Sequence, residues 1–371
     1  MRIAYFTTCQ SDEIFSKSIL KNQNINSSNQ VFHSRIINSL SLNNDIHVFS
    51  FNQNKEKCDS YLIKESTITW QYLSTRKNMI LNVLKQVKEC IHSEVQCEIT
   101  IVDTMNIRCL LAARKYANKN NVKLIGLLTD NPFNISGLSS NRAKQYIKYA
   151  RKCDAYIYLN EGLNKLFNAD KKPSLLIKGI TDNNHENNKV DSPYFFYAGT
   201  LLKQYGVIDL INAFESLNLN NVKLIIAGHH VNQEFLDSIK NKPNILYLGN
   251  IENKEVIKYE NGSIANINPR PFIENIDSFS IPSKVIEYSS KNSLLISGIS
   301  TSLKEDFKDS ILWVDDIHSL SNRMSEAYSM NIMERNNFIN DMNRVSKENF
   351  SKEITNSKIN NFIAKLGDKY E

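Results

Sequence analysis

The strongest chemical signal in the sequence is a group of charged residues in the stretch NPRPFIENIDSFSIPSKVIEYSSKNS, residues 268–293. Arg270 directly follows an expected strand, Ser283 and Lys284 open an expected helix, and Glu287 lies one turn further on. Free amides at a helix start, with an arginine fork and a lysine, can neutralise a diphosphate. Glu287 can accept two ribose hydroxyls, as acidic residues do in dinucleotide sites. The same pattern also fits a Ser-capped helix with an ordinary glutamate.

Three glycine-containing turns precede this stretch. In AGTLLKQYGV, residues 198–207, Gly199 leaves room for close approach to the backbone and Lys203 adds a cation, although a glycine there is also commonly structural. IIAGHH ends a strand with His229, and YLGNI ends with Ile251. Such turns suit a flat nucleobase held by backbone groups. No third ligand is suitably spaced from the two histidines, so no metal site is expected.

In the first half, the stretch LLTDNP places Thr129 and Asp130 at the end of an apolar strand. We expect these two residues to orient the acceptor or the donor sugar, and Asp130 fits a helix cap or turn equally well. Gln30 and His33, near the start of the first helix, are weaker acceptor-side candidates, and a structural role for His33 is favoured.

Apolar runs alternate with helical patterns along the chain, which predicts an α/β fold of parallel βαβ units. Strands are expected at 2–7, 45–51, 98–103, 122–129, 154–159, 194–198, 222–227, 245–248, 263–267 and 293–297. A polar stretch at 179–193 is expected to link two doubly wound, Rossmann-like domains, 1–182 and 183–348, that face a central cleft. A final helix at 349–371 is expected to pack back toward the first domain.

Composition sets the broad class. The 371 residues are 41% hydrophobic and 23% charged, as in a globular protein. The sequence shows no export signal and no membrane-spanning run, and its six cysteines lack metal-ligand spacing, so a cytoplasmic protein with reduced thiols is expected. A net charge of +6 does not indicate nucleic acid. The basic stretch 142–152 fits either a solvated helix face or a contact with anionic lipid.

The motifs AGTLLKQYGV, IIAG, YLGNI, NPRP and FSIPSKVIEY occur in this order between Tyr194 and Gly298. Together they resemble the C-terminal domain of glycosyltransferase family 4, especially its bacterial capsule and exopolysaccharide subgroup with a "PR … SFPSK … EY" signature. The first half resembles the family only in general pattern, including LLTDNP and IKGITD.

This resemblance implies a GT-B fold, retention of anomeric configuration, and no metal or other cofactor. It implies that the first domain serves the acceptor and the second binds a nucleotide sugar. Glu287 matches the second glutamate of the family's Glu-x7-Glu element, which contacts ribose; Ser283 and Lys284 match the phosphate-proximal helix start, and Gly199 the glycine beside the diphosphate.

Three residues depart from the family pattern. Phe279 stands at the first glutamate of the Glu-x7-Glu element, and Thr200 and Tyr205 replace a common arginine and lysine in the first turn. Charge neutralisation is then expected to fall to Lys203, Arg270 and Lys284.

The resulting hypothesis is a retaining glycosyltransferase that moves a sugar from a UDP- or GDP-sugar to a glycan or undecaprenyl-diphosphate-linked acceptor, in capsule, exopolysaccharide or O-antigen synthesis. Its expected catalytic residues are Asp130, Arg270 and Lys284; its expected substrate-binding residues are Thr129, Gly199, Thr200, Lys203, His229, Ile251, Ser283 and Glu287. Peripheral contact with the inner face of the plasma membrane is expected, and contact with nucleic acid is not.

Three alternatives were weighed. Phe279, Thr200 and Tyr205 leave room for a non-catalytic scaffold or chaperone subunit. An epimerase is disfavoured because the cleft segments show no clear acid/base pair. An NAD-dependent dehydrogenase is disfavoured because the first strand leads into TTCQSDE rather than a glycine-rich turn.

Overall fold

The computed structural model describes residues 1–20, 27–51, 59–75, 79–135, 137–182 and 192–367. Most of the expected linker, residues 183–191, therefore lies outside the described residues. The chain divides into two compact units. Unit 1 comprises Met1–Ile180, Ser278–Ser280 and Lys352–Glu371, and unit 2 comprises Thr181–Asp277 and Ile281–Ser351.

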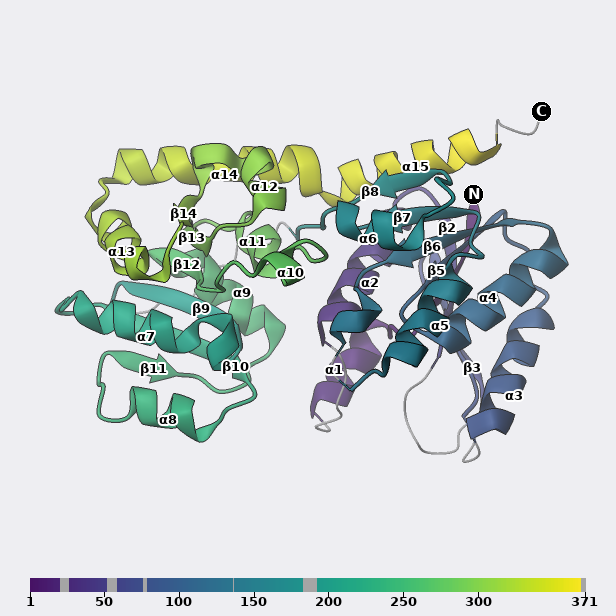
Figure 1. Ribbon diagram of the computed structural model, residues 1–371, viewed down its shortest axis with the longest axis horizontal. Helices are drawn as coiled ribbons and strands as arrows, with labels where there is room; N and C mark the ends of the chain where they lie inside the picture. The colour runs from purple at the N-terminus through teal and green to yellow at the C-terminus, as the bar shows by residue number, and fades with distance from the viewer. Residues whose placement is uncertain (21–26, 52–58, 76–78, 136, 183–191, 368–371) are drawn as a thin grey trace. The chain divides into compact units, whose positions relative to one another are not determined.

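Unit 1 is an eight-stranded sheet with strand order β3-β4-β2-β1-β5-β6-β7-β8 (Figure 1). Every strand pairs in parallel except β3, which runs antiparallel to β4 at one edge. The strands are β1 (Arg2–Thr7), β2 (Asp45–Ser50), β3 (Tyr61–Glu65), β4 (Ile68–Tyr72), β5 (Ile99–Asp103), β6 (Lys123–Leu128), β7 (Ala155–Tyr158) and β8 (Ser174–Leu176).

Helices cover both faces of this sheet, as alternating strands and helices require. One face packs against apolar side chains of α2 and α15 and the other against those of α3, α4, α5 and α6. The helices are α1 (Asp12–Leu20), α2 (Ser27–Leu40), α3 (Met79–Ile91), α4 (Ile107–Asn120), η1 (Pro132–Asn134), α5 (Ser140–Ala150), α6 (Glu161–Phe167) and α15 (Lys352–Gly367).

The segment Ser278–Ser280 belongs to unit 1 although its sequence neighbours belong to unit 2. Phe279 packs against the apolar cluster formed with α3, α4, α5 and α6, and Ser280 O accepts a hydrogen bond from Asn160 Nδ2 at 3.4 Å. A Cβ at Gly162 would lie 2.0 Å from Ser278 O, so only glycine allows this approach. Phe279, which replaces the family's glutamate, is therefore an apolar packing residue of unit 1.

Unit 2 is a six-stranded, wholly parallel sheet with order β11-β10-β9-β12-β13-β14. Its strands carry continuous apolar runs because helices cover both faces. The strands are β9 (Tyr194–Thr200), β10 (Lys223–His229), β11 (Ile245–Tyr247), β12 (Ala265–Asn268), β13 (Leu294–Gly298) and β14 (Leu312–Val314).

One face of the unit 2 sheet packs against α7, α8 and α13, and the other against α9, α11, α12 and α14. The helices are η2 (Lys203–Tyr205), α7 (Val207–Ser216), α8 (Gln233–Ile239), α9 (Asn253–Gly262), α10 (Glu274–Asp277), α11 (Ser283–Tyr288), α12 (Thr301–Phe307), η3 (Lys308–Ser310), η4 (Ile317–Ser319), α13 (Leu320–Ser329) and α14 (Ile332–Phe350). The α/β prediction is confirmed. The antiparallel strand β3 was not predicted from the alternation of apolar runs.

Candidate functional site

The carboxyl ends of β9 and β10 lie side by side in unit 2. Gly199 pairs with Gly228, and Thr200 pairs with His229, in the parallel register. A Cβ at Gly228, where φ is 153°, would lie 1.8 Å from Gly199 O, so no side chain fits between the strands. The ends of these strands therefore present main-chain groups, which is the kind of surface that lets a ligand approach the backbone closely.

Three tyrosine hydroxyls hold these strand ends in place. Tyr288 Oη accepts from Ala198 N at 3.1 Å and donates to Ala198 O at 3.3 Å. Tyr197 Oη donates to Thr200 O at 2.9 Å, and Tyr247 Oη donates to Gly228 O at 3.1 Å. Sequence analysis did not single out these tyrosines, although Tyr288 is the final residue of the VIEY motif.

Lys284 and Glu287 lie together on α11, as their spacing predicts. Lys284 Nζ is 2.9 Å from Glu287 Oε2 and 5.4 Å from the centre of the Tyr288 ring. Desolvation opposes the charge on Lys284, but Glu287 and Glu260 outweigh it and raise the pKa of the amine. Ser283 is the exposed first residue of α11, and Pro282 precedes it without a side-chain cap. Lys284 is therefore a partly buried cation held beside the Glu287 carboxylate.

His229 extends this group from the end of β10. Burial lowers the pKa of its imidazole, and the charges of His230 and Lys284 lower it further. The two histidine rings are 4.5 Å apart. The structure thus brings together Gly199, Thr200, His229, Lys284 and Glu287 at one edge of the unit 2 sheet. Ile251, just beyond β11, packs on the apolar cluster that includes Phe196 and Tyr259.

The other two predicted cations are paired elsewhere in unit 2. Arg270 follows β12, and its Nη2 is 3.4 Å from Asp277 Oδ1. Lys203, on η2, lies 3.0 Å from Glu234, and both side chains are exposed. Each of the three predicted cations therefore has a carboxylate partner, so a bound diphosphate would have to share or replace that partner.

In unit 1, the predicted residues lie where β6 ends. Thr129 is buried, and none of the described residues partners its Oγ1 at hydrogen-bond geometry. Asp130 is exposed, and η1 is capped not by Asp130 but by Asn131. Partial desolvation raises the pKa of the Asp130 carboxyl, the nearby hydroxyl of Thr129 offsets part of the rise, and the charge of Asp103 adds to it.

Behind these residues, a buried polar network joins α2 to β1 and β5. His33 is fully buried; its Nδ1 lies 2.7 Å from Tyr5 Oη and its Nε2 lies 3.5 Å from Asp103 Oδ2. Burial raises the pKa of the Tyr5 hydroxyl, and the charges of Cys9 and Asp103 raise it further. Gln30 closes a pair of hydrogen bonds with the main chain of Gln10 at 2.8 and 2.7 Å. Gln30 and His33 are thus buried scaffold residues, and sequence analysis missed Asp103.

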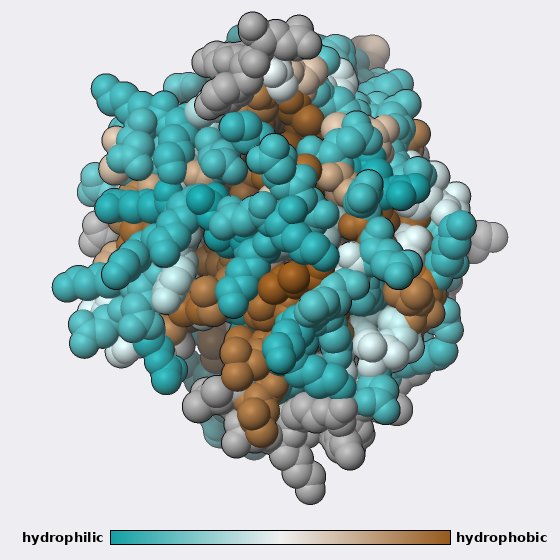
Figure 2. Space-filling model, turned by 90° about the vertical axis from the view of Figure 1, so that its right-hand side faces the viewer, coloured by the Kyte–Doolittle hydropathy of each residue, from teal (hydrophilic) through white to brown (hydrophobic). Residues whose placement is uncertain are grey.

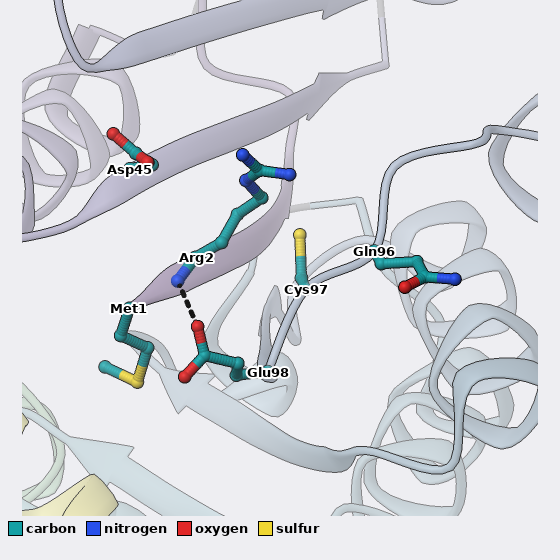
Figure 3. A pocket seen from close by; sticks show the side chains of 6 residues that line it. All are labelled: Met1, Arg2, Asp45, Gln96, Cys97 and Glu98. Carbon is teal, nitrogen blue, oxygen red and sulfur yellow. Dashed lines mark hydrogen bonds between the residues drawn. The ribbon is translucent and has the colours of Figure 1, made fainter.

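Two surface hollows lie outside these groups. One is at the opposite, amino-terminal edge of the unit 1 sheet, where Arg2 N donates to Glu98 Oε1 at 2.8 Å (Figure 3). Its lining is Met1, Arg2, Asp45, Gln96, Cys97 and Glu98. Ligands of parallel α/β sheets bind at the carboxyl edge, so this hollow is not the candidate site. The other lies on the basic face of α5, between Lys144, Ile147, Lys148 and Arg151.

Within the described part of the chain, no helix is long and apolar enough to cross a membrane. On one face of the molecule, hydrophilic side chains form most of the surface and apolar ones gather between them (Figure 2). No group of three histidine, cysteine or acidic side chains among the described residues could hold a metal ion.

Comparison with known proteins supports the reading of the fold. Residues 180–270 match the family model "Glycosyl transferases group 1", a segment that includes Gly199, Lys203, His229 and Arg270. No curated protein matches the sequence. Sucrose-phosphate synthase from Thermosynechococcus elongatus aligns over 100% of both chains with a TM-score of 0.72 and 11% identity.

Two further solved structures have a similar fold. A trehalose-6-phosphate structure from E. coli bound with UDP-2-fluoro glucose aligns over 99% of both chains, with a TM-score of 0.67 and 12% identity. A UDP-forming trehalose-phosphate synthase from Burkholderia xenovorans aligns over 99% of both chains, with a TM-score of 0.64 and 13% identity. The GT-B fold predicted from the sequence is confirmed. With a group 1 glycosyl transferase domain on that fold, the chain is in the glycosyltransferase class of enzymes.

Proposed function

We propose that the protein is a retaining glycosyltransferase that takes a sugar from a UDP- or GDP-sugar, without a bound metal, and transfers it to a glycan acceptor. The observation that carries the proposal is the edge of the unit 2 sheet, where the half-buried glycines Gly199 and Gly228 pair near the ends of β9 and β10, and Tyr288 ties the helix that carries Lys284 to β9. The matched group 1 segment includes the ends of β9, β10 and β12 at this edge, and it ends before Lys284 and Glu287.

In this proposal the diphosphate of the donor lies against the ends of β9 and β10. Lys284 supplies positive charge as the bond between sugar and phosphate breaks, and stabilising charge that develops on the leaving group is the largest contribution such a site can make. Arg270 joins Lys284 when its bond to Asp277 is shared with the donor, because an arginine fork can bind two oxygens at once. Glu287, released in part from Lys284, accepts the ribose hydroxyls.

Glu287, a carboxylate at this edge of unit 2, is paired with Lys284 and assigned to the ribose in this proposal, so a same-face attack fits best. The departing phosphate oxygen accepts the proton of the acceptor hydroxyl, and Thr129 and Asp130 orient the acceptor. The resemblance of five motifs to the capsule and exopolysaccharide subgroup of family 4 is the basis for proposing a lipid-linked acceptor at the cytoplasmic face of the membrane, in surface polysaccharide synthesis. The basic face of α5 suits contact with anionic lipid.

The test is a calorimetric titration of the full chain with UDP and with GDP. We expect one of the two to bind in the micromolar range, with ADP as the control nucleotide. A non-catalytic scaffold is the second candidate, favoured by Phe279 serving as a packing residue of unit 1. Binding of neither nucleotide would favour the scaffold and contradict the enzyme.

A further inference from the structure

We propose that the buried ion pair between Lys291 and Glu260 positions α11, the helix that carries Lys284 and Glu287, against the end of β9. Lys291 Nζ lies 3.6 Å from Glu260 Oε2, and the two side chains are 1% and 0% exposed. Glu260 belongs to α9, and Lys291 lies just beyond the end of α11. The inference rests on the proposed function, which gives α11 its role. Both members of the pair are positioning residues and are not expected to contact a ligand.

A charged pair in the core of unit 2 is costly to bury. Both charges lose their water, and their mutual attraction compensates for that loss only when the geometry is good. Apolar side chains of similar volume often stabilise a fold equally well or better. An ion pair differs from such an apolar contact because it favours one arrangement of the two elements that it joins. The pair therefore indicates that the position of α11, and not only the stability of unit 2, depends on it.

Further polar contacts fasten the segment after α11 to the end of α9. Ser293 Oγ donates to Glu260 O at 2.7 Å, and Asn292 N donates to Asn261 Oδ1 at 3.1 Å. Asn266 Nδ2, from β12, also donates to Glu260 O, at 2.9 Å. The ion pair is thus the charged part of a buried polar connection between α9 and the segment that follows α11.

Hydrogen bonds connect this segment to the proposed donor site. Lys291 N donates to Tyr288 O at 3.0 Å. The Tyr288 hydroxyl in turn bonds to Ala198 N at 3.1 Å and to Ala198 O at 3.3 Å. The next residue of β9 is Gly199, beside which the diphosphate is proposed to lie. A shift of Lys291 relative to Glu260 should therefore move the last turn of α11 and weaken its bonds to β9.

The amide of Ala198 reports on this placement without any ligand. It donates to the Tyr288 hydroxyl, so its hydrogen exchange should become faster when α11 leaves its position on β9. Leu248 N donates to Ile226 O at 2.9 Å and provides a reference amide in the same unit. Exchange at Ala198 alone therefore separates a displaced helix from a general loss of stability.

The experiment compares variants of the full chain by urea unfolding, amide exchange followed by NMR, and calorimetric titration with UDP and GDP. Lys291→Met alone takes the ammonium away from a buried carboxylate and should lower the urea midpoint. Glu260→Met combined with Lys291→Met removes both charges at similar volume, so the midpoint should return to the wild-type value or rise above it.

The double variant should nevertheless have a disturbed site. Its Ala198 amide should exchange about ten-fold or more faster than in the wild type, while the Leu248 amide keeps its rate. The nucleotide that the wild type prefers should bind about ten-fold more weakly, because the groups of the site are misplaced. The control is Glu252→Met with Lys254→Met, which removes an exposed pair with a 2.8 Å separation near the start of α9. It should leave all three measurements unchanged.

Two outcomes would overturn the inference. One is wild-type exchange of the Ala198 amide in the double variant. The other is faster exchange that the Leu248 amide shares, because the pair would then serve stability alone. A wild-type chain that binds neither nucleotide contradicts the proposed function and not the inference, because exchange at Ala198 still decides whether the pair positions α11.

Discussion

At the scale of single residues, the site in unit 2 is a set of paired charges. Lys284 pairs with Glu287, Arg270 with Asp277 and Lys203 with Glu234. The exposed pair between Lys203 and Glu234 contributes little to the stability of the fold, because water screens both charges. The pair between Lys284 and Glu287 is partly buried, and the proposed function assigns its cation to the phosphate of the donor. Sequence motifs point to Lys284 and Glu287, but their direct pairing is visible only in the structure.

Replacing Lys284 tests its role in catalysis. Lys284→Ala should lower kcat by about 100-fold or more, since removing one group that stabilises developing charge costs roughly 3 kcal/mol. Initial rates of nucleotide release from the donor measure this. Lys203→Ala, which removes an exposed cation of the same unit, is the control and should change the rate by less than about three-fold. Normal turnover by a folded Lys284→Ala variant would rule out the phosphate contact.

Two buried histidines make the stability of unit 1 depend on pH. Burial lowers the pKa of His33 and of His47, so the folded state prefers both in the neutral form. The unfolded chain binds protons below its ordinary histidine pKa of about 6.5, and stability should therefore fall as the pH drops from 7 toward the lowered folded pKa values. Urea unfolding between pH 5 and 8 measures the slope.

His33→Asn should make that slope shallower, and His33→Asn with His47→Asn shallower still. His92, an exposed histidine after α3, provides the control His92→Asn, which should leave the slope unchanged. A slope that the double variant retains would assign the pH dependence to other groups.

At the scale of elements, the carboxyl ends of the unit 2 strands are held by side chains from elsewhere in the chain. Tyr288 reaches from α11 to the main chain of β9 with two hydrogen bonds, and Tyr247 links β11 to β10. These contacts couple the helix that carries Lys284 to the strand that ends in Gly199. The geometry of the site therefore depends on the packing of α11.

Tyr288→Phe tests this coupling. The phenylalanine fills the same space but leaves the buried amide and carbonyl of Ala198 without the hydroxyl, so unit 2 should lose about 1–3 kcal/mol of stability. Nucleotide affinity should fall as well, because α11 is no longer tied to β9. Chemical denaturation and calorimetry give the two values. Tyr328→Phe, at a residue of α13 that is 41% exposed, is the control for removing a hydroxyl. Equal stability of the two variants would show that the hydrogen bonds between Tyr288 and Ala198 do not stabilise unit 2.

At the scale of the whole molecule, each unit has its own sheet and apolar cores. The residues proposed to bind the donor lie in unit 2. A ligand stabilises the unit that binds it by mass action. The two units should therefore respond to different ligands.

Differential scanning calorimetry with the preferred nucleotide tests this separation. At about 100 times the dissociation constant, binding adds roughly 2.7 kcal/mol to unit 2, which should raise its Tm by about 5–11 °C. The transition of unit 1 should stay within about 1 °C under the same conditions, because the nucleotide does not bind there. A rise in Tm confined to unit 1 would show that the nucleotide binds unit 1, which contradicts the proposed site.

The sequence by itself determined the class of fold and the type of enzyme. Alternating apolar runs predict parallel βαβ units, because a strand buried on both faces and an amphipathic helix leave distinct patterns over a few residues. The motifs from AGTLLKQYGV to FSIPSKVIEY lie near one another along the chain, so their glycosyltransferase character was also readable. Lys284 and Glu287 are one turn apart on one helix, which makes their proximity a local property.

Tertiary structure alone decided the contacts between residues distant in the chain. Asp103 meets His33 and Tyr288 meets Ala198 because strand order and helix packing bring them together. The antiparallel strand β3 and the inclusion of Phe279 in unit 1 were likewise visible only in the tertiary structure. Such contacts depend on which surfaces are buried against each other. The periodicity of a short window of sequence predicts a helix or a strand, but not the surface against which it packs.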